Sequence, residues 1–229
     1  MSSPLIALIP LRAGSKGLPG KNTRPLAGRP LYTHTLEQAR AAGIGVSLVS
    51  TDIAELLDAD LGPDVRVVAR PAALAGDATS MDAVLRHVLA NDLVGAWTVV
   101  LLQATSPMRA PADIRRAIAL HASGNFNLVL SAARADSCVL KWGCAEGARF
   151  VPLSKVEHCF SNRASLPPVY RPDGAVYVFD ADWFRNTGTL ASSPIGMIET
   201  PINRAIDIDT LADFKDVEAR LVDQETSQP

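Results

Sequence analysis

Short apolar runs alternate with longer amphipathic stretches along the first 135 residues. The runs are rich in Val, Ile and Leu and have the length of buried strands, whereas the stretches between them carry apolar residues at helical spacing. In one such stretch, Val84, Leu85, Val88 and Leu89 form a single apolar stripe. The pattern predicts strands at 5–11, 46–50, 65–69, 98–103 and 128–132, and helices at 31–42, 53–61, 81–90 and 112–123.

The alternation of strands and helices predicts an α/β fold. Because parallel strands are joined by crossover helices, this order indicates a mainly parallel sheet between two layers of helices. In such folds ligands bind in the crevice outside the carboxyl ends of the strands. We expect one domain over residues 1–222, followed by a frayed polar tail over residues 223–229.

The pattern changes after about residue 135. Two strands, at 139–144 and 149–153, are predicted to form a hairpin around Glu146 and Gly147. Further strands are expected at 174–180, 195–200 and 205–208, and helices at 182–185 and 211–222. We therefore interpret residues 136–200, approximately, as an insertion in the α/β core. Insertions of this kind often build a substrate wall or a dimer contact.

Composition excludes several classes of protein. The 229 residues are 48% hydrophobic and 20% charged, which suits one compact core, and a formal net charge of −2 disfavours binding to nucleic acid. No apolar run approaches the roughly 18 residues of a membrane span, and the start lacks the charged region of a signal peptide. Three cysteines without CxxC spacing, Cys138, Cys144 and Cys159, fit a reducing compartment. We expect a cytoplasmic protein with no nucleic-acid or membrane partner.

Positive charge gathers at the start of the chain and negative charge at its end. Residues 1–36 hold five basic side chains and no acidic one, whereas residues 205–229 hold seven acidic and two basic side chains. Much of the basic stretch lies in a turn, residues 12–22, directly after the first predicted strand. Its glycines let the backbone approach a ligand, and free amides favour an anion. The side chains suited to a polyphosphate are Arg12, Lys16 and Lys21.

The basic turn matches neither of two common phosphate-binding motifs. Gly14 and Gly20 are one residue too far apart for a Walker A loop, and Asn22 stands where Ser or Thr would bind magnesium. The GxGxxG pattern of a dinucleotide site is not found either. Two interpretations stay open, a polyphosphate-binding turn and a flexible, solvated surface loop. The position after the first strand favours the former.

Two carboxylates near the end of the chain form a second candidate site. Asp207 and Asp209 are two residues apart around the strand predicted at 205–208, so their side chains would point the same way. Hard oxygen ligands with no nearby histidine favour Mg²⁺, with Mn²⁺ as an alternative. In the other interpretation, Asp209 and Thr210 only cap the last predicted helix, with Asp213 three residues beyond Thr210.

The basic turn resembles a motif of the acylneuraminate cytidylyltransferases, the CMP-sialic acid or CMP-nonulosonic acid synthetases. Residues 12–22 are similar to the run Arg-x-Gly-Ser-Lys-Gly-x-Pro-x-Lys-Asn of that family. Further blocks follow in the family's order at 49–52, 70–80, 101–109, 163–177 and 205–210. The resemblance covers most of the chain. It implies a Rossmann-like three-layer nucleotidyltransferase fold with a small inserted subdomain for dimerisation and substrate binding.

The resemblance assigns nucleotide-binding roles to residues of the first blocks. Those implied to hold the triphosphate are Arg12, Ser15, Lys16 and Lys21. Those placed at the cytosine base are Asn22 and Arg70, where a guanidinium can donate to a base carbonyl and an amide can both donate and accept. Ser80, at the end of the 70–80 block, is also assigned to nucleotide binding. Without the resemblance, Arg70 would be interpreted as a helix-capping or surface arginine. Met81 departs from the family, because many relatives carry a small polar residue there.

The resemblance also assigns substrate-binding roles on the sugar side. The implied residues are Gln103, Lys141, Arg163, Arg171 and Tyr177. Arginines suit an acidic sugar because the guanidinium pairs with a carboxylate through two hydrogen bonds. Gln103 has an equal alternative, in which it bonds the backbone of its own turn, and each loop charge has the alternative of a solvated surface position. The chain departs from the family's pattern at Ala104, Ala164 and Asp173.

The implied activity is a Mg²⁺-dependent transfer of CMP from CTP to an acidic nine-carbon sugar, by a homodimer. The sugar's C2 hydroxyl would attack the α-phosphorus in line, and pyrophosphate would leave. The residues implied in catalysis are Arg12, Lys21, Gln103, Asp207 and Asp209. Two alternatives stay open. One is a synthetase for the eight-carbon sugar Kdo or another sugar nucleotidylyltransferase, and the other is a nucleotide-binding module of the same fold without catalysis.

Overall fold

A computed structural model describes residues 3–191 and 193–226 of the chain. Within them, seven strands form one sheet: β1 (Leu5–Leu11), β4 (Ser47–Thr51), β5 (Val65–Ala69), β6 (Thr98–Leu102), β7 (Leu128–Ala135), β10 (Val169–Asp180) and β11 (Ile195–Thr200). Their order is β11-β7-β10-β6-β1-β4-β5. Neighbours are parallel except for β10, which runs antiparallel to both β6 and β7. The sheet is therefore mixed but mostly parallel.

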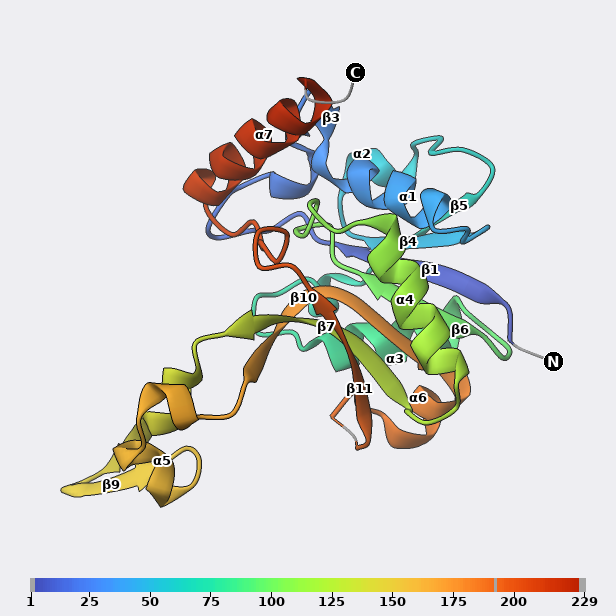
Figure 1. The fold of residues 1–229 in the computed structure, drawn as a ribbon. Helices are drawn as coiled ribbons and strands as arrows, with labels where there is room; N and C mark the ends of the chain where they lie inside the picture. The colour runs from blue at the N-terminus through green and yellow to red at the C-terminus, as the bar shows by residue number, and fades with distance from the viewer. Residues whose placement is uncertain (1–2, 192, 227–229) are drawn as a thin grey trace.

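Helices and short ribbons complete the described fold (Figure 1). The α-helices are α1 (Leu31–Ala41), α2 (Ala54–Leu57), α3 (Met81–Asn91), α4 (Pro111–Ala122), α5 (Val156–Phe160), α6 (Ala181–Thr187) and α7 (Leu211–Thr226). The 3-10 helices are η1 (Lys21–Thr23), η2 (Ala72–Leu74), η3 (Ser137–Lys141) and η4 (Arg163–Ser165). Two small ribbons pair β2 (Pro25–Leu26) with β3 (Arg29–Pro30), and β8 (Gly143–Glu146) with β9 (Arg149–Pro152).

Apolar packing on both faces of the sheet explains the three layers. On β1, Ala7 and Ile9 pack toward α1 and α4, whereas Ile6 and Leu8 pack toward α3 and α6. A strand with helices on each side is buried on each side, and these four residues are at most 1% exposed. The apolar stripe predicted on α3 lies in the second of these cores. The predicted mainly parallel α/β fold with helices on both faces is confirmed.

Most elements predicted in the first 135 residues have the predicted type and place, and α2 is the main exception in length. The apolar pattern predicted a helix over 53–61, but α2 ends at Leu57. The Asp60 carboxylate accepts a hydrogen bond from the Gly62 backbone at 3.0 Å, and Gly62 has a φ of +103°. This local turn supplies the backbone with an alternative to helical hydrogen bonds, so the helix stops early.

The strand predicted at 205–208 is wrong. In the structure this segment pairs with no described strand and instead passes over the carboxyl end of β6, where the Ile208 amide donates to the Thr105 carbonyl at 2.8 Å. Ala205 and Ile208 are buried, and Ile208 packs in a small core with Phe214 of α7. The alternation in the sequence therefore reflects one-sided burial of a connecting segment and not pairing in a sheet.

The segment over residues 137–168, called the arm below, leaves the body of the molecule (Figure 1). It holds η3, β8, β9, α5 and η4, and it joins the end of β7 to the start of β10. The predicted hairpin is present, but its first strand begins at Gly143 because 137–141 form η3, capped by the Asp136 carboxylate. Within the insertion expected at 136–200, β10 and β11 are strands of the main sheet.

Helix α7 is the last described element, and it packs over the basic turn through Phe214 and Val217. This helix continues to Thr226, so it is longer than the helix predicted over 211–222. Residues 227–229 of the predicted polar tail lie outside the described residues. None of the described helices has both the length and the apolar character needed to cross a membrane.

Candidate active site

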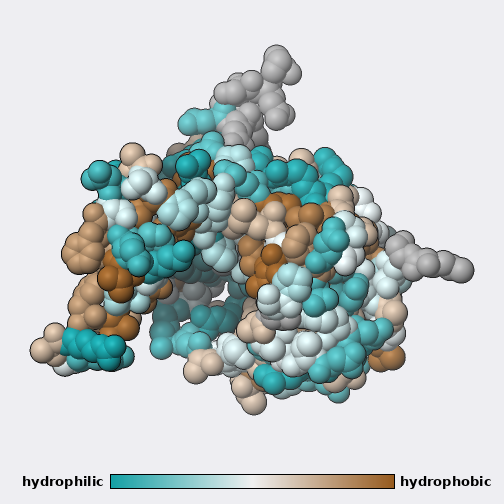
Figure 2. Space-filling view, turned by 60° about the horizontal axis from the view of Figure 1, so that its bottom comes forward, coloured by the Kyte–Doolittle hydropathy of each residue, from teal (hydrophilic) through white to brown (hydrophobic). Residues whose placement is uncertain are grey.

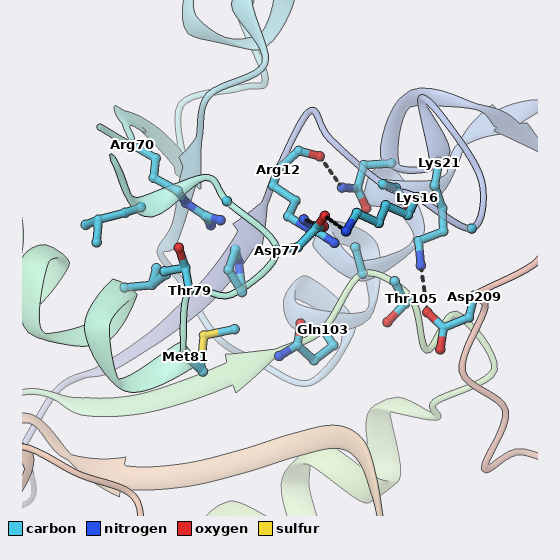
Figure 3. A pocket seen from close by; sticks show the side chains of 18 of the residues that line it. Arg12, Lys16, Lys21, Arg70, Asp77, Thr79, Met81, Gln103, Thr105 and Asp209 are labelled. Carbon is cyan, nitrogen blue, oxygen red and sulfur yellow. Dashed lines mark hydrogen bonds and ion pairs between the residues drawn. The ribbon is translucent and has the colours of Figure 1, made fainter. Parts of the chain in front are cut away.

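Four parallel strands end at one edge of the sheet, and each is followed by a polar side chain. Arg12 follows β1, Asp52 follows β4, Arg70 follows β5 and Gln103 follows β6. A cavity of about 550 Å³ lies at this edge (Figure 3). Because the carboxyl ends of parallel strands meet there, Arg12 and Gln103 line one space although they are 91 positions apart in sequence.

The structure brings many of the predicted site residues to this cavity. Those that line it are Arg12, Ser15, Lys16, Lys21, Asn22, Arg70, Gln103 and Asp209. The predicted residues that do not line it are Ser80, Lys141, Arg163, Arg171, Tyr177 and Asp207. All residues predicted for the nucleotide except Ser80 thus line one cavity, whereas among the residues predicted for the sugar only Gln103 lines it within a single chain.

The basic turn is held in place from both sides. Its Ala13 amide donates to the Asp52 carboxylate at 2.9 Å, and the Asn22 amide group donates to the Arg12 carbonyl at 2.9 Å. Gly20 takes a left-handed backbone conformation, with φ of +66°, just before η1 begins at Lys21. A residue without Cβ adopts this conformation at little cost. The turn is therefore a defined structure and not a freely solvated loop.

Gly17 brings the turn against the segment that precedes α7. A Cβ at this position would lie 2.2 Å from the backbone oxygen of Asp209, so no other residue fits without movement. The Lys21 ammonium reaches the same segment, where it contacts the Ile208 carbonyl and pairs with the Asp209 carboxylate at 3.1 Å. Lys21 is 93% buried. The basic start and the acidic end of the chain thus meet at this point.

The two aspartates of the second candidate site lie near each other, although no strand carries them. Loss of hydration raises the pKa of Asp207, and the charge of Asp209 adds to this rise, while a hydrogen bond from Thr105 and the charge of Lys21 oppose it. The described residues contain no cluster of three or more His, Cys, Asp or Glu side chains arranged to hold a metal. A cation here would therefore have two aspartates as protein ligands.

Thr210 and Asp213, and not the side chain of Asp209, cap the start of α7. The Asp213 carboxylate accepts from the Thr210 amide at 2.7 Å, and the Asp213 amide donates to the Thr210 hydroxyl at 3.2 Å. This reciprocal pair is a capping box at the start of α7. The side chain of Asp209 takes no part in the cap and contacts Lys21 instead.

A carboxylate that had no assigned role occupies the middle of the basic groups. Asp77 pairs with Arg12 through one oxygen and with Lys16 at 2.8 Å through the other (Figure 3). Hydrogen bonds from Lys16 and then from Arg12 lower the pKa of Asp77. The sequence contained a signal for this residue, because Asp77 belongs to the block at 70–80.

Arg70 is buried at the opposite side of the cavity. Only 7% of the residue is exposed, and its Nη2 donates to the Ser50 carbonyl at 2.8 Å. No group among the described residues bonds its buried Nε. Burial lowers the pKa of the guanidinium, opposed by the charge of Asp52. Arg70 is therefore not a surface arginine, and its side chain is one wall of the cavity.

The apolar part of the cavity wall comes from the start of α3 and from η2. Met81 lies beside Thr79 and Gln103 in Figure 3, and Leu74 and Val84 also line the space. Ser80, which the resemblance assigned to nucleotide binding, accepts a hydrogen bond from the Ala83 amide at 3.3 Å as the N-cap of α3. Thr79 and Met81, on either side of Ser80 in the sequence, line the cavity instead.

Gln103 lines the cavity with its side chain while its backbone holds the turn. The Gln103 carbonyl accepts from Arg109 at 3.1 Å, and the same guanidinium donates to the Ala175 carbonyl at 2.6 Å. Arg109 is 3% exposed, and burial lowers its pKa to about 9, so it stays charged at neutral pH. Arg109 therefore ties the loop after β6 to β10, a role that the sequence motif did not indicate.

The residues predicted for the sugar side lie on the arm and on β10. Lys141 ends η3, and Arg163 is mostly exposed on the arm, where it pairs with Asp136 at 3.3 Å. Arg171 is exposed on β10. Tyr177 lies on the same strand with a pKa raised by burial and, to a smaller extent, by nearby carboxylates that include Asp207. Tyr177 is therefore close enough to Asp207 for the charge of that carboxylate to affect its pKa.

Comparison with known proteins gives close agreement on family. An N-acylneuraminate cytidylyltransferase of Streptococcus agalactiae is 30% identical over 221 residues, which cover 91% of this chain and 51% of that protein. A CMP-N,N'-diacetyllegionaminic acid synthase of Legionella pneumophila is 32% identical over 225 residues, which cover 92% and 93%. The chain thus spans about half the length of the streptococcal relative and nearly all of the Legionella one.

A solved structure shares the fold. CMP:2-keto-3-deoxy-manno-octonic acid synthetase, solved with CTP, matches with a TM-score of 0.72 at 18% sequence identity, covering 97% of this chain and all of that one. The family model described as cytidylyltransferase matches residues 6–182, which include the basic turn, Arg70, Gln103 and the arm. The chain therefore belongs to the cytidylyltransferase family.

Proposed function

We propose that this protein transfers the cytidylyl group of CTP to a nonulosonic, sialic-type acid and releases pyrophosphate. The observation that carries the proposal is the charge of the cavity. Four cationic side chains line it, Arg12, Lys16, Lys21 and Arg70, against the two carboxylates of Asp77 and Asp209. The relatives named N-acylneuraminate cytidylyltransferase and CMP-N,N'-diacetyllegionaminic acid synthase support the choice of sugar class.

The basic turn is the proposed site of the triphosphate. Backbone amides next to Gly14 and Gly17, together with three cationic side chains, suit a chain of negatively charged oxygens. Arg70 and the apolar wall formed by Leu74, Met81 and Val84 lie on the other side of the cavity. A flat, largely apolar ring with polar edges suits that wall, so we assign it to the cytosine base.

In the proposed reaction, the C2 hydroxyl oxygen of the sugar acid forms a bond to the α-phosphorus of CTP. The bond from that phosphorus to the pyrophosphate oxygen breaks in line, and the hydroxyl proton passes to solvent. Positioning and charge neutralisation carry most of such a transfer. Lys21 and Arg12 offset the charge that gathers on the leaving pyrophosphate. Because Lys21 is almost fully buried, its charge is screened by little water.

Asp207 and Asp209 are the proposed ligands of Mg²⁺, with Mn²⁺ as the alternative ion. The donor set fits, because Mg²⁺ commonly takes one or two carboxylates and completes its shell with water and substrate phosphates. Loss of hydration raises the pKa of Asp207 and the charge of Asp209 adds to the rise, so a cation at this pair would favour the ionised form. When bound, the ion would supply positive charge to the phosphate oxygens.

The arm is the proposed contact between two copies of the chain. It exposes large apolar side chains, each 57–86% exposed: Trp142, Phe150, Leu153, Val156 and Phe160. Hydrophobic surface gathers on the projecting lobe at the left of Figure 2. Exposed apolar groups gathered on one segment mark an interaction site. Lys141 and Arg163, proposed for the sugar, lie on this arm, so we assign them to the cavity of the partner copy.

Release of pyrophosphate from CTP tests the proposal. The protein is incubated with CTP, Mg²⁺ and one of four acids: a sialic, a legionaminic, a pseudaminic or the eight-carbon Kdo acid. We expect release with at least one nine-carbon acid and much slower release with Kdo. Preference for Kdo would replace the proposed substrate class. Release with none of a wider panel of sugars, although CTP binds, would favour a nucleotide-binding module without catalysis.

A further inference from the structure

The cations of the basic turn are already paired with carboxylates of the same chain. Arg12 and Lys16 share Asp77, and Lys21 pairs with Asp209. Asp209 belongs to the proposed metal pair, but Asp77 comes from a different segment, the turn between η2 and α3. Its carboxylate points into the group of basic side chains that would hold phosphate (Figure 3).

The pairs made by Asp77 contribute little to the stability of the fold. Its side chain is 38% exposed, that of Arg12 35% and that of Lys16 84%. Ion pairs with this exposure are screened by water and salt. The turn that carries Asp77 has a backbone hydrogen bond of its own, from the Thr79 amide to the Gly76 carbonyl at 3.1 Å. The position of Asp77 is therefore better explained by a role in the cavity than by a role in the stability of the fold.

The carboxylate has room to leave these partners. A second hollow of about 340 Å³ adjoins the cavity, and its walls include Gly14 and Ala75, which do not line the cavity itself. Arg12, Lys16 and Asp77 line both spaces. A phosphate chain on Arg12 and Lys16 would displace Asp77 toward this hollow or toward solvent. The displaced charge would still lie within a few ångströms and repel the phosphates.

We propose that Asp77 is a built-in competitor of phosphate groups, which lowers the affinity of the basic turn for pyrophosphate and thereby speeds release of that product. This inference rests on the proposed function for the identity of the product. A turn with several uncompensated cations would hold a highly charged pyrophosphate tightly. One internal carboxylate limits that affinity for every phosphate chain that uses Arg12 and Lys16, whether product or nucleotide.

Binding of inorganic pyrophosphate by calorimetry tests the inference without any sugar and without metal. Removing one unit charge about 5 Å from the ligand in a water-exposed site tightens binding by about three- to tenfold. We expect this gain in Asp77→Asn and in Asp77→Ser, and near wild-type affinity in Asp77→Glu, which keeps the charge. Asp64→Asn is the matched control, because Asp64 is paired with Arg40 outside the cavity.

The opposite result is equally informative. If Asp77 positions the turn or contacts a ligand directly, Asp77→Asn and Asp77→Ser will bind pyrophosphate as weakly as the wild type or more weakly. Either outcome overturns the inference. In turnover assays, the constant for inhibition by pyrophosphate should fall in Asp77→Asn by the same factor as in binding. Absence of turnover with every sugar would count against the proposed function, while the binding experiment would still decide the role of Asp77.

Discussion

At Gly17 the space between two segments is too small for any side chain, and this gives a sharp test of the site. Gly17→Ala places a Cβ 2.2 Å from the Asp209 backbone oxygen, so the turn has to move away. We expect the free energy of unfolding to fall by about 1–3 kcal/mol, measured by urea denaturation. Gly14→Ala is the control, since nothing lies within 4 Å of a Cβ there. Equal stability of the two variants would contradict the close approach.

Asp209 combines an exposed carboxylate with a buried partner, so its loss should affect chemistry more than folding. Its side chain is 74% exposed and pairs with Lys21. In Asp209→Ala we expect turnover of CTP to fall by about 100-fold or more, with a small change in melting temperature. Asp216→Ala, which removes an exposed ion pair of α7, is the control. Turnover like that of the wild type would contradict the assignment of Asp209 to the metal.

Residues were predictable from sequence where a local motif marks them. Lys21 and Asp209 each stand in such a motif, and the structure brings them to 3.1 Å. Asp77 and Arg109 also lie in recognised blocks, but their roles depend on partners 65 and 66 residues away, Arg12 and Ala175. A motif records the identity of a residue and not its distant partner, so these two roles needed three-dimensional structure.

Among the elements, several strands were predictable almost to the residue. β1, β5 and β11 begin and end where the pattern placed them, because apolar residues of each are fully or partly buried against the cores. The segment 205–208 shows the limit. One-sided burial of a connection gives the same alternation as a strand, and only the presence of a hydrogen-bonding neighbour separates the two. The position of β10 between β6 and β7 also depends on pairing between strands that are far apart in sequence, so the local pattern could not predict it.

Asp173 joins three strands at the irregular part of β10. Its carboxylate, 7% exposed, accepts hydrogen bonds from the hydroxyls of Ser131 on β7 and Thr200 on β11 and from the Ala175 amide. Because Asp173→Ala leaves these buried donors unpaired, we expect the free energy of unfolding to fall by about 2–3 kcal/mol. Asp173→Asn keeps an oxygen acceptor and should lose less. Urea unfolding of the three proteins measures both differences.

A result in which alanine and asparagine are equally stable would mean that water or a rotated hydroxyl replaces the carboxylate. The departure from the family at this position would then carry no structural consequence. If the alanine variant is less stable than the asparagine variant, Asp173 is a structural residue whose hydrogen bonds hold β7, β10 and β11 together. The register shift in the pairing of β10 with β7, between Pro172 and Tyr177, is the feature that the side chain would hold.

At the scale of the whole molecule, the basic start and the acidic end of the chain come together at the cavity. The basic turn follows the first strand and the acidic segment precedes the last helix, yet Lys21 and Asp209 are in contact. A small apolar core under α7, including Leu18 and Ile208, holds the two segments together. The oppositely charged ends of the chain therefore lie against each other beside the cavity, where Lys21 and Asp209 pair.

The arm supplies the last test, because the proposed assembly divides one active site between two copies. Lys21→Ala should inactivate the cavity of its own chain, and Lys141→Ala the cavity of its partner. In a dimer that contains one of each variant, one site then has an intact cavity and an intact arm. Random exchange makes about half of the dimers mixed, so about a quarter of wild-type activity should return on mixing two inactive variants. If Lys141 serves the cavity of its own chain, mixing will restore no activity.

Phe160→Glu places a charge on the most exposed apolar residue of the arm. This variant should yield monomers, measured by light scattering, and should remove the rescue of activity on mixing.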